Sequence, residues 1–344
     1  MAAPHSSERA KTQNLPAAKQ ATNGLSYVLP YRSTGTEDLE DLTAYLEWLT
    51  SRAEVIVVDG SPAPAWDEHH RRWSSFLLHI APRAGLRHAN GKVDGVITGV
   101  EHATHDKVIV ADDDVRYDED SLTQMTRLLQ DSDLVRPQNY FASHPWHALW
   151  DSGRTLLNRA MGADYPGTLG IRRKTFLSAG GYDGDVLFEN LELIRTMEEA
   201  GGVSTSPLDL YVARVPPDAG HFWQQRTRQA YDDLAQPVRL VFFLSLAPAV
   251  LAALLSGRRR AVGGGVIVTI VVAEWGRRRA GGADRWPAVA AVMSPLWVCE
   301  RAVCSWLALG NRLIRGGVRY RDERLKVAAN SRRTIRSRLG RSRP

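Results

Sequence analysis

The stretch VIVADDDV, residues 108–115, places three consecutive carboxylates directly after four apolar residues. The apolar run is typical of a buried strand, with the acidic residues at its carboxyl end. Adjacent carboxylates repel one another, so a positive charge must lie nearby or their pKa values must rise. Mg²⁺ or Mn²⁺ meets this need, because such ions bind carboxylates together with phosphates. Side-chain alternation in an extended chain would place Asp112 and Asp114 on one side and Asp113 on the other. The alternative is a solvated acidic turn.

Apolar runs alternate with helical patterns on the N-terminal side of this stretch. The pattern predicts strands at 25–29, 55–58, 76–80 and 107–111, and helices at 39–49 and 93–102. This alternation favours parallel βαβ units in an α/β fold, where ligands bind beyond the carboxyl ends of the strands. Asp59 closes the second strand and is therefore a candidate for binding a base or ribose, with an Asx-turn as the alternative.

A loop bounded by glycines, residues 85–91, precedes Lys92 at the start of a predicted helix. A lysine at a helix N-terminus suits a phosphate group, because the helix dipole adds to its positive charge. The sequence therefore predicts a phosphate-binding role for Lys92.

Composition divides the chain into four segments. We predict a disordered leader at 1–24, an α/β domain at 25–236, an apolar helical region at 237–310 and a basic tail at 311–344. The net charge is +6, but the tail alone carries +10, so the remaining residues sum to −4. Such a tail is typical of a solvated segment attracted to polyanions, either anionic lipid or nucleic acid. The leader lacks the apolar core of a signal peptide, so we expect the N-terminus to stay in the cytoplasm.

The helical region contains three apolar stretches, at 240–255, 261–273 and 286–309, separated by arginine clusters. A membrane-spanning helix needs about 20 mostly apolar residues, which the first stretch reaches only with its flanks. The arginine clusters and the tryptophans nearby favour membrane association, with buried core helices as the alternative. These tryptophans are Trp275, Trp286, Trp297 and Trp306. A full span would place Arg258–Arg260 outside, so a shallow hairpin or interfacial helices are the other arrangements.

The remaining reactive residues give weaker signals. Cys299 and Cys304 have no metal-ligand partners at a suitable spacing, and we expect both to be buried apolar residues. His144 and His147 lack the pattern of a zinc site, and His221 is a candidate for a nucleotide contact. The sequence contains neither a nucleophile elbow nor a Walker loop, which disfavours hydrolases and P-loop enzymes of those classes.

Short motifs follow one another in a fixed order through residues 25–235. They are VLPY (28–31), VIVVDGS (55–61), NGK (90–92), VADDDV (110–115), GTLGIRR (167–173), AGGYD (179–183), FENLEL (188–193) and QRTRQ (225–229). Together they resemble the family 2 glycosyltransferases, whose GT-A fold is a Rossmann-like nucleotide-binding domain with a mostly parallel sheet. The last motif is similar to the Gln-Arg-x-Arg-Trp motif of membrane-bound members such as ceramide glucosyltransferase.

The resemblance implies sugar transfer, with inversion, from a UDP- or GDP-sugar to a lipid, lipid-linked or glycan acceptor, with Mg²⁺ or Mn²⁺. A divalent ion held by Asp112 and Asp114 would stabilise the charge on the leaving diphosphate. Donor-binding roles are implied for Pro30, Asp59, Lys92, Asp112, Asp113 and Arg226. Catalytic roles are implied for Asp114, Arg228 and Glu189, and acceptor-binding roles for Gln225, Asn190 and Glu192.

The sequence departs from the family pattern at two positions. The family has Glu-Asp where this chain has Glu189-Asn190, and that aspartate is the general base. A neutral amide cannot accept a proton, so Glu189 is our choice, with three other carboxylates as alternatives. These alternatives are Glu192, Asp183 and Asp185. Gln229 replaces the tryptophan of the last motif, which disfavours a processive synthase.

The favoured hypothesis is a membrane-associated inverting glycosyltransferase at the cytoplasmic face of the membrane, with an anionic lipid surface as a partner. A non-catalytic protein that binds nucleotide or recruits a partner is the alternative, and Asn190 is the residue that supports it. Nucleic-acid binding through the tail is disfavoured, because the tail lacks interleaved aromatic residues or a known module.

Overall fold

The computed structural model describes residues 24–33, 39–162, 164–320 and 323–341. The predicted disordered leader therefore lies outside the described residues, apart from Gly24. A seven-stranded sheet forms the centre of the N-terminal part, and four of its six strand pairs are parallel. The strands in spatial order are β3 (Leu78–Ile80), β2 (Glu54–Asp59), β1 (Leu25–Tyr31), β4 (Lys107–Ala111), β8 (Thr168–Arg172), β6 (Leu134–Val135) and β9 (Ser204–Thr205). The predicted α/β fold with a mostly parallel sheet is confirmed.

Strand β1 continues through Pro30 instead of ending before it. Its pairing with β4 stops at Val28, while its pairing with β2 runs on to Tyr31. Pro30 therefore lies where β1 has one neighbour, and a residue without a backbone N–H is tolerated at such a position.

Helices cover both faces of the sheet, and each face has its own apolar core. The helices next to the sheet are α1 (Glu40–Thr50), α2 (Ala63–Trp73), α3 (Gly91–His102), α4 (Glu119–Asp131), α6 (Arg173–Ser178) and α7 (Glu189–Glu199). Apolar residues of α1, α2 and α4 pack on one face, and those of α3, α6 and α7 pack on the other. Because both faces are covered, the central strands are apolar nearly throughout, as the sequence pattern indicated.

A smaller sheet extends from the carboxyl end of β4. Its strands in spatial order are β5 (Val115–Arg116), β10 (Tyr211–Arg214) and β7 (Gln138–Phe141). The backbone N–H of Val215, which follows β10, donates to the carbonyl of Asp114 at 2.8 Å. The smaller sheet thereby fixes the end of β10 beside the three consecutive aspartates.

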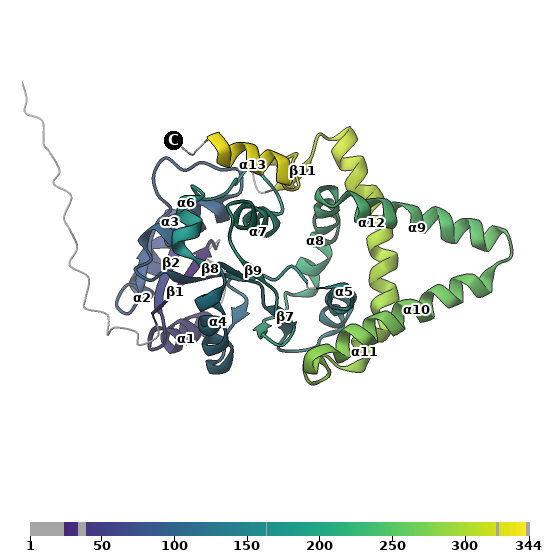
Figure 1. Ribbon diagram of the computed structural model, residues 1–344, viewed down its shortest axis with the longest axis horizontal. Helices are drawn as coiled ribbons and strands as arrows, with labels where there is room; N and C mark the ends of the chain where they lie inside the picture. Colours follow the sequence, from purple (N-terminus) through teal and green to yellow (C-terminus); the bar gives the residue numbers. More distant parts are fainter. Residues whose placement is uncertain (1–23, 34–38, 163, 321–322, 342–344) are drawn as a thin grey trace, which may run out of the picture.

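The part of the molecule beyond the two sheets is helical, and two of its helices form a projecting hairpin. This part contains α5 (Trp146–Met161), α8 (Ala219–Tyr231), η1 (Asp232–Ala235), α9 (Pro237–Leu255), α10 (Arg259–Arg278), η2 (Arg279–Asp284), α11 (Ala288–Val292) and α12 (Ser294–Ile314). Helices α9 and α10 extend away from the sheets and meet at a tip, while α12 crosses their base (Figure 1). Among the described residues, Pro237–Leu255 and Ala288–Ile314 are long and apolar enough to cross a membrane.

The stretch 286–309 differs from the two hairpin helices, because one of its faces packs against α5 and α8. Glu300 lies 3.6 Å from Arg226, and Arg301 forms an ion pair with Asp233 at 3.1 Å. Two of the four tryptophans that indicated a membrane interface are buried in protein, whereas the other two are exposed. The buried pair is Trp286 and Trp297, and the exposed pair is Trp275 and Trp306. Cys304 is buried as expected, but Cys299 is exposed.

The prediction of a solvated basic tail is wrong for residues 318–341. This segment forms a hairpin of β11 (Val318–Tyr320) and β12 (Glu323–Leu325), followed by α13 (Arg332–Arg341), which lies along α7 (Figure 1). Arg332 and Arg336 form ion pairs with acidic residues at the end of α7. The charge pattern of the segment alone could not indicate this, because its acidic partners lie more than 130 residues earlier in the chain.

Candidate active site

The three consecutive aspartates form a turn between β4 and β5 rather than an extended strand. The backbone N–H of Val115 donates to the carbonyl of Asp112 at 3.2 Å, which closes the turn. All three aspartates line one cavity of about 260 Å³. The predicted alternation, with Asp113 on the opposite side, is therefore wrong, because alternation holds for a strand and not for a turn.

Two basic side chains compensate the charge of this acidic turn. Lys92 Nζ lies 2.5 Å from Asp112 Oδ1, and Arg214 contacts Asp114 through Nη2 at 2.5 Å and Nε at 3.0 Å. Burial lowers the pKa of both bases, but attraction to the carboxylates outweighs burial and raises it, so both stay charged. The predicted positive charge is thus present. Arg214 was missed, because it is the last residue of β10 and belongs to no motif.

The position of Lys92 follows from the start of α3. The side chain of Asn90 caps this helix by accepting a hydrogen bond from the backbone N–H of Lys92 at 3.2 Å. The capped first turn directs Lys92 into the cavity, where its ammonium bridges Asp112 and Glu189.

The donor set of the acidic turn fits a divalent cation. Burial and repulsion from Asp114 and Asp112 raise the pKa of Asp113, so an added positive charge would relieve a real repulsion. Carboxylate oxygens are the ligands that Mg²⁺ and Mn²⁺ prefer. The packing here is close, because a Cβ added at Gly167 would lie 2.7 Å from Asp112 Oδ2. The residues that would hold the ion are Asp112 and Asp114.

Glu189 is a buried carboxylate with one oxygen that lacks a partner. It is the first residue of α7 and lines the same cavity as the acidic turn. Its Oε1 accepts from Lys92 at 2.6 Å, whereas Oε2 is buried without a hydrogen-bond partner among the described residues. Burial raises the pKa of Glu189, and the nearby charge of Lys92 lowers it only in part. A carboxylate oxygen in this state is suited to accept a proton from a bound hydroxyl group.

The other acidic candidates for a general base do not line this cavity. Glu192 accepts hydrogen bonds from the backbone N–H and the side chain of Asn330, at 2.7 and 3.0 Å. Asp183 accepts from the backbone N–H of Asp185, and Asp185 accepts from the backbone N–H of Ala89 in the loop before α3. The predicted acceptor-binding role of Glu192 is a correction, because Glu192 lies three residues after Glu189 and its carboxylate is held by Asn330 outside the cavity.

Asn190 likewise points away from the cavity. Its side-chain amide donates to the carbonyl of Pro166 at 3.1 Å, and it is not among the lining residues. The predicted acceptor-binding role of Asn190 is therefore also a correction. Its amide holds the loop before β8 against α7.

Helix α8 contributes one face to the cavity. Gln225, Arg228 and Gln229 lie at helical spacing and all line it, together with Arg226. Arg226 is buried, and it forms an ion pair with Asp151 on α5 at 2.8 Å. Its charge is therefore largely compensated within the protein.

Arg228 occupies a different environment from its neighbour. Its guanidinium lies over the ring of Tyr320 at 4.5 Å. Asp151 and Tyr320, which also border the cavity, were missed because neither lies in a recognised motif.

Two histidines also line the cavity. His147 Nε2 lies 2.7 Å from the carbonyl of Pro217 and donates a hydrogen bond to it. The Nδ1 of His147 is buried without a partner among the described residues. His221 lies in the first turn of α8, consistent with its candidacy for a nucleotide contact.

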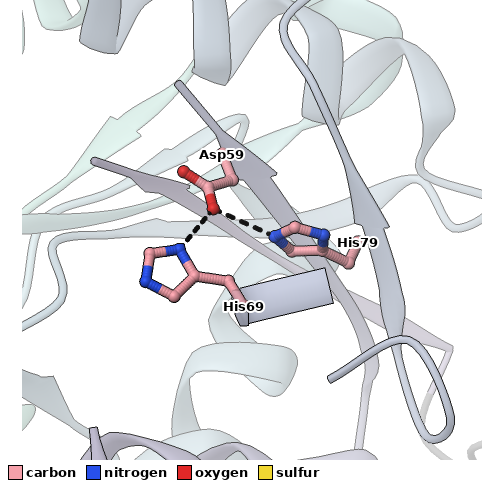
Figure 2. A group of neighbouring side chains, drawn as sticks. All are labelled: Asp59, His69 and His79. Atoms are coloured by element: carbon pink, nitrogen blue, oxygen red, sulfur yellow. Dashed lines mark hydrogen bonds and ion pairs between the residues drawn. The ribbon is translucent and has the colours of Figure 1, made fainter. Parts of the chain in front are cut away.

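Asp59 lies in a separate cluster at the end of β2. Its Oδ2 accepts from His69 Nδ1 at 2.6 Å and from His79 Nε2 at 3.1 Å (Figure 2). Its Oδ1 accepts from the backbone N–H of Ser61 at 2.8 Å. Burial alone would raise the pKa of Asp59, but the hydrogen bonds lower it to about 2. The three ligand atoms lie within 4.8 Å of one another and could hold a metal ion, while hydrogen bonds already satisfy the carboxylate.

Two predicted donor-binding residues lie outside the described cavity. Asp59 is almost fully buried, so its role toward a nucleobase stays a prediction. Pro30 packs against α3, where a Cβ added at Gly95 would lie 2.8 Å from the proline ring. This packing against α3 explains the position of Pro30 in the structure.

Comparison with known proteins agrees with the fold. The glycosyl transferase family 2 model matches residues 39–180, which include the acidic turn and Lys92. A mannosyltransferase from Pyrobaculum calidifontis, solved with GDP-Man and Mn2+, has a TM-score of 0.50 and 16% identity, and the match covers 85% of this chain and 87% of that chain. Mannosyl-3-phosphoglycerate synthase from Rubrobacter xylanophilus has a TM-score of 0.38 and 15% identity, over 58% of this chain and 69% of that chain. The comparison with curated proteins gave no match. The fold is that of the GT-A glycosyltransferases.

Proposed function

We propose that this protein is an inverting glycosyltransferase that transfers a sugar from a nucleotide-sugar to a hydroxyl or phosphate oxygen of an acceptor. The observation that carries the proposal is the shared cavity. It brings the acidic turn and Glu189, whose Oε2 has no hydrogen-bond partner among the described residues, to the same space. The former suits a diphosphate with its metal ion, and the latter suits proton removal from an acceptor.

Glu189 acts as the general base in this proposal. Its Oε2 takes the proton of the acceptor hydroxyl while the acceptor oxygen forms a bond to the anomeric carbon. The bond from that carbon to the diphosphate oxygen breaks on the opposite face, so the configuration is inverted. Lys92 holds the other carboxylate oxygen at 2.6 Å and thereby fixes the orientation of the base.

Positive charges around the cavity favour departure of the diphosphate. A divalent cation bound by Asp112 and Asp114 would supply electrostatic stabilisation of the leaving group. Arg228 adds positive charge, because it lines the cavity and no carboxylate forms an ion pair with it among the described residues. Arg226 contributes less, since Asp151 already pairs with it.

The projecting hairpin supports a lipid or lipid-linked acceptor at the cytoplasmic membrane face. Helix α9 is largely exposed although it is apolar apart from Arg239 and Ser245. Its 19 residues span about 28 Å, close to the hydrocarbon thickness of a bilayer. An apolar hairpin next to the cavity would bring the catalytic part to an acceptor that is held in the membrane.

The non-catalytic alternative loses the feature that supported it. Asn190 occupies the expected position of the base in the sequence, but its amide is engaged with Pro166 outside the cavity. The neighbouring Glu189 supplies the carboxylate that Asn190 lacks. We therefore favour the enzyme.

The proposal is tested with the purified full chain, Mn²⁺ and a set of UDP- and GDP-sugars, by measuring nucleotide release and sugar transfer. Asp114→Asn should abolish turnover, and Asp120→Asn, on an exposed position of α4, is the matched control. Equal turnover of wild type and Asp114→Asn would contradict the proposed function.

A further inference from the structure

The C-terminal segment 318–341, which we call the strap, pairs with the backbone that leads into the candidate base. The N–H of Leu187 donates to the carbonyl of Val327 at 3.0 Å, and the N–H of Phe188 donates to Ala328 at 2.7 Å. Phe188 directly precedes Glu189 in the chain. The strap therefore fixes the point from which the Glu189 side chain enters the cavity.

A second set of contacts holds the strap along α7. Asn330 donates both its backbone and side-chain N–H groups to Glu192, whose side chain is fully buried. Further along, Arg332 and Arg336 pair with Glu199, and their hydrogen bonds lower the pKa of this glutamate. The strap is thus attached at both ends of the helix that carries the base.

Tyr320 is the strap residue that reaches the cavity itself. Its ring lies under the guanidinium of Arg228, and its hydroxyl donates to Asn90 Oδ1 at 3.1 Å. The same Asn90 oxygen caps α3 by accepting from the N–H of Lys92. One side chain therefore contacts the arginine on α8 and the cap that positions the lysine on α3.

We propose that the strap is part of the active site and that Tyr320 is a positioning residue for Arg228 and Lys92. The ring holds the guanidinium flat, so that its N–H groups face the cavity, and the hydroxyl fixes the start of α3. This inference rests on the proposed function, because the positioned cations matter for a bound diphosphate. The strap, whose composition is that of a basic tail, would thus have a direct effect on the binding of the nucleotide-sugar donor.

The test compares Tyr320→Phe and Tyr320→Leu with a matched control on α8 that contacts another part of the strap. Tyr231→Phe is that control, because its hydroxyl also donates to the strap, at Lys326, without lining the cavity. GDP and UDP with Mn²⁺ are titrated by calorimetry, and KM for the donor and kcat are measured separately. Thermal unfolding is recorded for every variant.

The expected result is a weaker nucleotide affinity and a higher donor KM for both Tyr320 variants. Loss of the hydroxyl should weaken binding about fivefold, and loss of the ring should weaken it further. Tyr231→Phe should lower thermal stability without changing affinity or KM. A purely structural role for Tyr320 would instead lower the stability and leave the KM of the folded enzyme unchanged.

Two outcomes separate the inference from the proposed function. An active wild type whose Tyr320 variants bind and turn over the donor equally well would overturn the inference alone. A wild type that neither binds these nucleotides nor transfers sugar would contradict both.

Discussion

At the scale of single residues, the chemistry depends on the two oxygens of Glu189. Lys92 holds one of them, and the other is buried without a hydrogen-bond partner among the described residues. Glu189→Gln keeps the shape but cannot accept a proton, so kcat should fall about 100-fold or more. Nucleotide affinity should change little, since the acidic turn is intact. Steady-state kinetics together with calorimetry on the same samples measures both quantities.

The pH dependence of the reaction follows from the same residue. Burial raises the pKa of Glu189 above its ordinary value near 4.5. The base acts only when it is ionised, so kcat should fall as the pH drops through this raised value. The acid limb should be absent in Glu189→Gln. An unchanged acid limb in this variant would mean that another group is the base.

The Asp59 cluster predicts a pH-dependent contribution to stability. Its folded pKa of about 2 lies below the ordinary value of 3.8, so the stabilisation is present above pH 3.8 and is lost as the pH falls toward 2. The shift corresponds to about 2 kcal/mol of unfolding free energy at neutral pH.

Asp59→Asn should remove this contribution and flatten the loss of stability between pH 4 and 2. Urea unfolding at several pH values measures it. Asp67→Asn, at an exposed position of the neighbouring helix, is the control and should behave as wild type. Identical acid unfolding of Asp59→Asn and wild type would show that the hydrogen bonds in Figure 2 add no stability.

Sequence reasoning identified the residues that lie in local motifs and missed those that lie elsewhere. Asp112, Asp114 and Lys92 were predicted, because each follows a strand or starts a helix in a recognisable pattern. Glu189 was chosen among four carboxylates, and only the structure separates it from Glu192, because Glu189 lines the cavity whereas Glu192 is held by Asn330. Arg214 carries no local signal, since its role arises from pairing between distant strands.

At the scale of elements, α7 and the strap depend on each other. The buried carboxylate of Glu192 accepts hydrogen bonds from the backbone and side-chain N–H groups of Asn330. Asn330→Ala removes the side-chain donor, and an incompletely satisfied buried carboxylate should lower the unfolding free energy by about 2 kcal/mol. Ser331→Ala removes a hydroxyl that bonds at the exposed surface and should cost less. Urea denaturation compares the two, and equal stabilities would contradict the coupling.

The hairpin predicts membrane binding that is separable from catalysis. Leu251 and Leu255 are exposed on α9, with 57% and 80% of their surface accessible. Replacing both with aspartate should abolish flotation with anionic vesicles, because a charge in the apolar layer is costly. Turnover of a water-soluble donor should persist. Leu177→Asp, an exposed leucine on α6, should leave flotation unchanged, and persistent flotation of the hairpin variant would exclude α9 as the anchor.

The elements themselves were predictable to different degrees. Strands β2 and β4 and helix α3 follow apolar periodicity, so their predicted bounds agree closely with the structure. The strap was not predictable, because arginines that pair with a distant helix have the same local pattern as solvated arginines. Helix α12 was predicted as apolar, but Glu300 and Arg301 turn inward to partners on other helices.

At the scale of the whole molecule, the cavity is assembled from both halves of the chain. Its lining runs from Lys92 on α3 to Tyr320 in the strap, and it includes residues of α5, α7, β10 and α8. The charged residues of α12 contact α8 and η1, so the apolar helices and the cavity share one packed interior. This arrangement would bring an acceptor held in the membrane and a soluble nucleotide-sugar donor to the same general base, Glu189.

The most direct measurement is a crystal structure of the full chain with Mn²⁺ and whichever nucleotide-sugar it binds. We predict the ion and the diphosphate at Asp112 and Asp114, with the anomeric carbon of the sugar facing the side of the cavity formed by Glu189. A nucleotide-sugar bound elsewhere, with the acidic turn still paired only to Lys92 and Arg214, would contradict the account.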